Sequence, residues 1–77
     1  MVILNNESAI AYAKDLFASY GNSYGTTFTV GEASPSLESS EGFEAIDVEV
    51  RDGSDIPFPI TVWIEQGEAG PYLYGEW

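Results

Sequence analysis

Residues 44–65 read EAIDVEVRDGSDIPFPITVWIE and contain two stretches in which apolar and polar side chains alternate. The first stretch, residues 44–52, and the second, residues 58–65, each repeat with a period of two, which predicts strands with one buried face. Between them, residues 52–55 have the composition of a turn, so we expect an antiparallel pair of strands. Pro59 has no N–H to donate, so its strand, or the start of that strand, is expected at a sheet edge.

A helical period replaces this alternation near the start of the chain. Asn5 or Asn6 can cap the first free N–H groups of a helix, and Glu7 suits the positive end of the helix dipole. Gly21 is a natural C-terminal cap because glycine accepts a positive φ. We therefore expect a helix over residues 7–20. Apolar residues spaced by three and four give it one buried stripe, which consists of Ala9, Ile10, Ala13, Leu16, Phe17 and Tyr20.

The remaining segments predict further strands and turns. Residues 26–30, TTFTV, have the composition of a strand, and residues 31–42, rich in Ser and Glu, predict a surface loop. Residues 66–70 predict a second turn. Residues 71–77 predict a short last strand in which Leu73 faces inward and Tyr72, Tyr74 and Glu76 face outward.

Together these segments predict a single α+β domain over residues 1–77, with one N-terminal helix packed on a three- to four-stranded antiparallel sheet. The chain is 44% hydrophobic and 14% aromatic, which favours a folded domain over a disordered one. The inward strand residues should meet the helix stripe, and these are Ile46, Val48, Val50, Phe58, Ile60, Val62, Ile64 and Leu73.

Negative charge dominates the composition. Thirteen acidic residues face one lysine and one arginine, which gives a formal net charge of −11. A nucleic-acid binder needs a basic surface, and Lys14 and Arg51 cannot supply one, so we expect no direct binding to nucleic acid or to an anionic membrane. There is no cysteine, and the apolar opening, residues 1–4, is too short for a signal peptide or a membrane span. We therefore expect a cytoplasmic protein.

The residue types needed for catalysis are missing. Activation of a serine or threonine nucleophile usually relies on histidine, and the chain has neither histidine nor cysteine. Residues 52–55 resemble part of a calcium loop, but the twelfth position of that loop, which needs a bidentate Glu, holds Trp63. We expect no enzyme activity, no catalytic residues, no metal and no cofactor.

Most acidic residues fall on the predicted sheet and its turns. If the helix covers one sheet face, Asp47 and Glu49 begin a rigid row of anions on the other, because alternate strand residues lie roughly 6.6 Å apart. Trp63 should share that face, where an aromatic side chain can anchor a protein partner and charges can steer it. Alternatively, Trp63 covers its strand neighbours or pairs two copies of the chain. The candidate partner-binding residues are Glu44, Asp47, Glu49, Asp52, Asp55, Trp63, Glu65 and Glu68.

In make-up the whole chain resembles the small acidic inhibitors of phages and mobile elements, which include DNA-mimic and anti-CRISPR proteins. The residues that carry the resemblance are the acidic strand series Glu44, Asp47 and Glu49, the acidic turns at Asp52, Asp55 and Glu68, and the scarcity of Lys and Arg. The resemblance implies a non-enzymatic inhibitor, a monomer or homodimer. Its partner would be a basic nucleic-acid-binding protein, such as a nuclease or a CRISPR effector complex, whose nucleic-acid-binding groove it occupies.

Two other classes fit the composition. An immunity protein that covers a basic nuclease toxin would be equally small and acidic. A domain from a halophile would show the same excess of acid with a structural or interaction role. The halophile hypothesis predicts charge on every face, whereas the outer helix positions include four uncharged residues, which counts against it: Ser8, Ala11, Ala18 and Ser19.

The stability of this chain should rise with added salt and in mild acid, because its excess negative charges repel one another and both treatments weaken the repulsion. Raising sodium chloride from about 0.01 M to about 1 M shortens the screening length from roughly 30 Å to roughly 3 Å. We expect the melting temperature, followed by circular dichroism at fixed pH, to increase over this range. A fall would contradict the charge argument.

Overall fold

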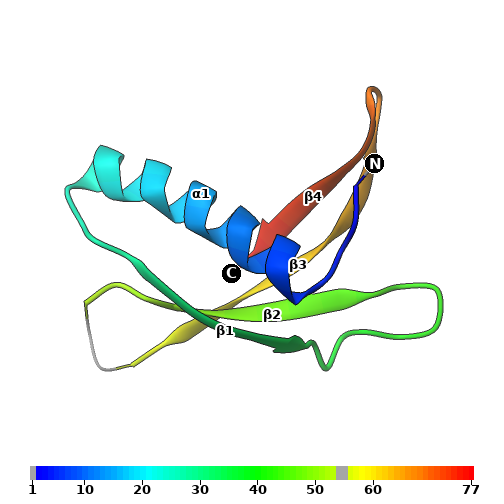
Figure 1. Ribbon diagram of the computed structural model, residues 1–77, viewed down its shortest axis with the longest axis horizontal. Helices are drawn as coiled ribbons and strands as arrows, with labels where there is room; N and C mark the ends of the chain where they lie inside the picture. Colours follow the sequence, from blue (N-terminus) through cyan, green and yellow to red (C-terminus); the bar gives the residue numbers. More distant parts are fainter. Residues whose placement is uncertain (1, 54–55) are drawn as a thin grey trace.

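A single antiparallel sheet with strand order β1-β2-β3-β4 lies beneath one helix in the computed structural model, which describes residues 2–53 and 56–77 (Figure 1). The chain therefore has the predicted α+β fold, with four strands. The elements in chain order are α1 (Asn6–Tyr24), β1 (Thr29–Pro35), β2 (Ala45–Arg51), β3 (Phe58–Gly67) and β4 (Gly70–Glu76).

The start of α1 is fixed by a reciprocal pair of hydrogen bonds. The Ser8 backbone N–H donates to Asn5 Oδ1 at 2.8 Å, and the Asn5 backbone N–H donates to Ser8 Oγ at 2.9 Å. This capping box satisfies two donors that the first helical turn leaves without partners. Of the two predicted caps, Asn5 is therefore the one used.

The end of α1 differs from the prediction, because the helix passes through Gly21 and ends at Tyr24. Gly25 is the cap, with φ of 68°, and its N–H donates to the Gly21 carbonyl. Gly21 is needed for a different reason: a Cβ there would lie 2.5 Å from the Thr26 carbonyl oxygen. The backbone at Thr26 thus folds back against the last turn of α1 at Gly21, where there is no side chain in the way.

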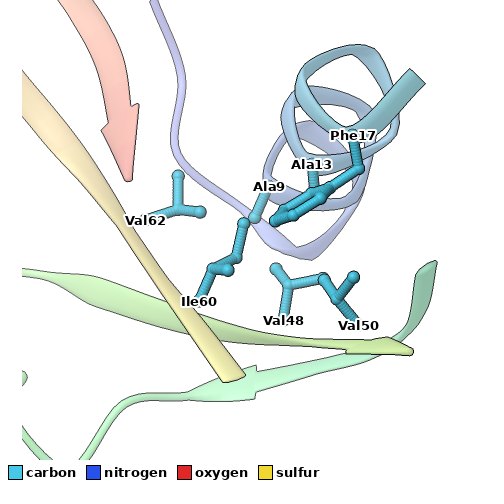
Figure 2. Packing of buried hydrophobic residues seen from close by; sticks show 7 residues of the cluster. All are labelled: Ala9, Ala13, Phe17, Val48, Val50, Ile60 and Val62. Carbon is cyan, nitrogen blue, oxygen red and sulfur yellow. The ribbon is translucent and has the colours of Figure 1, made fainter. Parts of the chain in front are cut away.

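The core lies between α1 and the two central strands. Ala9, Ala13 and Phe17 of the helix face the sheet (Figure 2). The small alanines let the helix approach closely, and Phe17 fills the space beyond them. The fully buried strand residues are those predicted from the alternation, namely Val48, Val50, Ile60 and Val62. Burying each such side chain stabilises the fold by about 1.5–3 kcal/mol.

The residues at the edge of the predicted core do not all pack against its centre. Ile46, Phe58 and Leu73 are partly buried and pack against the central cluster, as predicted. Ile64 does not join them and lines a surface depression beside Leu4.

The first strand was misplaced by the sequence analysis. β1 begins at Thr29 and includes Gly31 to Pro35, which had been assigned to a loop. Val30 pairs with Val50 but Ala33 pairs with Val48, so the register shifts between them. Such a bulge inserts an unpaired residue and breaks the period of two on which the prediction relied.

The segment between β1 and β2 is an ordered extension of this hairpin. Ser36 is buried, and its backbone N–H donates to the Ala45 carbonyl at 3.0 Å. Nearer the tip, Ser40 and Phe43 exchange backbone hydrogen bonds of 2.7 and 2.9 Å. The segment therefore has a defined path beside the sheet.

Pro59 lies near the start of β3, where it pairs with Glu49 of β2. The pairing between β3 and β4 begins only at Thr61. Pro59 therefore has a strand on one side alone, which confirms the expectation that the start of its strand lies at an edge.

Gly21→Ala should destabilise the protein, although alanine is worth about 1 kcal/mol more than glycine inside a helix. The added Cβ would force the Thr26 backbone to move, and overpacking of this kind costs about 1–3 kcal/mol. We expect a lower free energy of unfolding in urea. Ser23→Ala, at an exposed position in the same helical turn, is the control and should change that free energy by less than about 0.5 kcal/mol. A Gly21→Ala variant more stable than the natural chain would contradict the close approach to Thr26.

Candidate functional site

The sheet face that points away from α1 is the candidate site, and we call it the open face. Because the even-numbered residues of β2 and β3 face the helix, the odd-numbered residues lie on the open face. The register aligns them in rows across the strands. Ala45, Trp63 and Tyr74 form one row, and Asp47, Thr61 and Glu76 form the next.

Four aromatic residues form a continuous series of contacts on the open face, which we call the aromatic row: Phe43, Trp63, Tyr74 and Tyr72. The ring centroids of Trp63 and Tyr74 are 5.5 Å apart, those of Phe43 and Trp63 6.1 Å, and those of Tyr72 and Tyr74 6.4 Å. These distances are typical of favourable aromatic pairs. Trp63 thus lies on the predicted face, beside Tyr74. Its row neighbour Ala45 is only 2% exposed, so Trp63 also helps to cover the sheet.

Beside the aromatic row lies an acidic row of Asp47, Thr61 and Glu76. The Thr61 hydroxyl donates to Asp47 Oδ1 at 2.8 Å. Neighbouring strands are about 4.8 Å apart, so Asp47 and Glu76 stand roughly 10 Å apart on either side of Thr61. Next to the aromatic row, Glu65 Oε1 accepts a hydrogen bond from Trp63 Nε1 at 2.6 Å. The predicted residues Asp47 and Glu65 are therefore held in place by neighbours on the same face.

Glu49 lies on the open face, but it is not the unbalanced anion that was predicted. Arg51 is on the same face of β2, and its Nη2 lies 2.9 Å from Glu49 Oε1. The Arg51 Nε–H donates to the same oxygen at 3.0 Å. Both side chains are more than a third exposed, so this pair adds about 0–1 kcal/mol of stability. Its main effect is to balance the charge of Glu49.

The remaining predicted residues are not gathered at one place. Glu44 precedes β2 and lines a depression with Leu4 and Ile64, so it is not part of a row with Asp47. Asp52 and Glu68 are exposed in the turns at opposite ends of β3, a strand of ten residues. That length separates them by roughly 30 Å. Asp55 lies outside the residues that the structure describes.

Sequence reasoning left five residues of the aromatic row and of the neighbouring depression out of the candidate list: Glu38, Phe43, Tyr72, Tyr74 and Glu76. Glu76 could have been included, since it alternates with Gly75 on the last strand and had been expected to face outward. Glu38 and Phe43 reach the open face only through the path of the β1–β2 connection, for which the sequence has no periodic signal. Glu38 and Glu76 line one shallow depression of about 330 Å³ with Pro59, Thr61, Trp63 and Trp77.

Acidic residues are unevenly distributed between the two layers. Of the thirteen, only Glu7 and Asp15 belong to α1, which also carries Lys14. In residues 2–53 and 56–77, no group of three or more acidic side chains is arranged to hold a metal ion. In the same part of the chain, no helix combines the length and apolar character needed to cross a membrane.

Tyr12, which lies outside the open face, has a perturbed pKa. Burial raises the pKa of the Tyr12 hydroxyl on α1, and a backbone hydrogen bond with Gly75 partly opposes this effect. Tyr12 therefore belongs to the packing of the helix on β4 and not to the open face.

The open face has the features of a surface that binds another protein. Aromatic side chains lie near its centre and carboxylates lie around them, which is the arrangement of anchors and steering charges found in protein interfaces. Comparisons with protein-family models, with curated proteins and with solved structures find no significant match to this chain.

Trp63→Ala should destabilise the fold as well as remove an anchor. The substitution deletes two ring contacts and uncovers Ala45, and truncating a partly buried tryptophan should cost about 2 kcal/mol, less than the 3–5 of a fully buried one. Tyr24→Ala is the control, because the Tyr24 side chain is 74% exposed and its loss should cost less than about 0.5 kcal/mol. Urea unfolding of both variants measures the difference. Equal, small effects would mean that the aromatic row does not support the sheet.

Proposed function

We propose that this chain is a non-enzymatic inhibitor whose open face binds the basic, nucleic-acid-binding groove of another protein. The partner class is a bacterial nuclease or a CRISPR effector complex, and the inhibitor acts in the cytoplasm of the host cell. The single observation that carries the proposal is the aromatic row lying directly beside the acidic row on one rigid sheet face.

The pairing of these two rows supports a nucleic-acid groove as the target. Proteins hold single-stranded nucleic acid with basic side chains that contact phosphates and with aromatic or arginine side chains that stack on bases. A surface with carboxylates beside flat rings offers such a groove a substitute for both parts of its ligand. The chain carries the negative charge at Asp47 and Glu76 and the rings at Trp63 and Tyr74.

The distribution of charge supports a directed interaction. If the acidity served only to keep the chain hydrated at high salt, the exposed side of α1 would carry a similar share of it. Instead eleven of the thirteen acidic residues lie outside the helix. Opposed charges across an interface speed association and make it sensitive to salt, while a few aromatic anchors supply much of the affinity.

The test is competition between this protein and nucleic acid for a captured partner. The partner is first isolated from a bacterial lysate with tagged protein, washed at low salt and eluted at high salt. Its nucleic acid should then be displaced by the natural chain, and binding should weaken steeply as salt rises. If the partner binds this protein and nucleic acid at the same time, the proposal fails.

Two double variants locate the binding surface. Glu38→Lys with Glu76→Lys reverses charge on the open face, and Glu7→Lys with Asp15→Lys makes the same change in net charge on α1. We expect the open-face variant to lose at least about tenfold in affinity and the helix variant to change much less, because close charges matter more than distant ones. Thermal unfolding controls for the fold of both variants. Equal losses would show that net charge alone, and not the open face, governs binding.

A further inference from the structure

The depression at the β4 side of the open face combines two carboxylates with the Trp63 indole, whereas the Trp77 ring packs against Phe17 and Tyr20 of α1. Glu38 and Glu76 line it together with Trp63 and Trp77, and Thr61 and Pro59 complete its walls. Its volume is about 330 Å³. The two carboxylates and the Trp63 indole come from three different parts of the chain, the β1–β2 connection, β3 and the end of β4.

Glu38 is held at this place by Ser36, the buried residue that follows β1. The Glu38 backbone N–H donates to Ser36 Oγ at 3.1 Å, and the Ser36 N–H donates to the Ala45 carbonyl at 3.0 Å. Ser36 itself is only 7% exposed. These bonds attach the connection to the start of β2 and direct Glu38 toward β3. On the other side, Glu76 is fixed by its pairing with Thr61.

The carboxylates of Glu38 and Glu76 are available to a partner, unlike those of Asp47, Glu49 and Glu65, which have partners within the chain. Asp47 accepts from Thr61, Glu65 accepts from Trp63, and Glu49 pairs with Arg51. Among the described residues, neither the Glu38 carboxylate nor the Glu76 carboxylate makes an ion pair or accepts a hydrogen bond. Negative charge that no described residue balances therefore lies beside the half-buried Trp63 side chain.

We propose that this depression binds the guanidinium group of an arginine from the partner. The planar group would lie against the Trp63 indole, and its N–H donors would reach Glu38 and Glu76. A guanidinium can stack on an aromatic ring and donate to carboxylates at the same time, whereas the compact, strongly hydrated ammonium group of lysine cannot stack. This inference rests on the proposed function, because it names the partner side chain that the open face recognises.

The pocket can be tested without the partner, by following the indole N–H signal of Trp63 in NMR spectra. The probes are three blocked tripeptides, acetyl-Gly-Arg-Gly-amide and its Lys and Gln counterparts, titrated at constant ionic strength and pH. The arginine peptide should give a saturable shift of the Trp63 signal. The lysine peptide should bind at least about threefold more weakly than the arginine peptide, and the glutamine peptide should give no saturable shift.

A matched pair of variants decides whether the carboxylates act as proposed. Glu38→Gln with Glu76→Gln should weaken the binding of the arginine peptide roughly tenfold, because each partly exposed charge contributes up to a few-fold in affinity. Glu7→Gln with Asp15→Asn removes the same charge from α1 and should leave the affinity within about twofold. Equal binding of the arginine and glutamine peptides, or equal effects of the two variants, would overturn the inference.

The outcome is separable from that of the proposed function. If the arginine peptide does not bind while this chain still displaces nucleic acid from the partner through its open face, the pocket is wrong and the inhibitor role stands. If the arginine peptide binds as described while the partner binds nucleic acid and this chain together, the pocket stands and the role as a competitor falls.

Discussion

The register between β2 and β3 is the constraint on which the rest of this structure depends. Val48 lies opposite Ile60, and Ile46 lies opposite Val62, so the apolar residues of both strands meet on one face. A slip of one residue would turn every side chain of one strand to the other face. The same register that builds the core against α1 therefore aligns Ala45 with Trp63 and Asp47 with Thr61 on the open face.

The negative charge of the open face adds to a net charge that destabilises the folded state. With a net charge of −11 on 77 residues, the compact state repels itself, and its small core has little stability to spare. The structure lessens the repulsion locally: the Arg51 side chain balances Glu49, and hydroxyl and indole donors stabilise Asp47 and Glu65. No residue in the described part of the chain compensates Glu38 and Glu76 in this way, which makes their position beside the aromatic row the most informative feature of the open face.

The sequence predicts those parts of the fold in which a simple period holds. The helix stripe and the β2–β3 pair follow from periods of three to four and of two, and Asn5 caps the helix as its residue type suggests. The bounds of β1 could not be predicted in this way, because its bulge interrupts the period of two. The role of Gly21 was predicted wrongly, because the close approach of the Thr26 backbone leaves no pattern in the neighbouring sequence. The pairing of Glu49 with Arg51 was predictable, since alternate strand residues share a face, whereas the position of Glu38 depends on the path of a loop.

The central claim is that a partner meets the open face and not the helix, and hydroxyl-radical footprinting of the complex tests it most directly. Hydroxyl radicals oxidise aromatic side chains readily, and such side chains are present on both the helix and the open face. The reactivity of each layer can therefore be followed separately. The account predicts that Trp63, Tyr72 and Tyr74 become protected from oxidation when the partner binds, while Tyr20 and Tyr24 of α1 react as in the free protein. Protection of the two helix tyrosines with unchanged reactivity on the open face would contradict it.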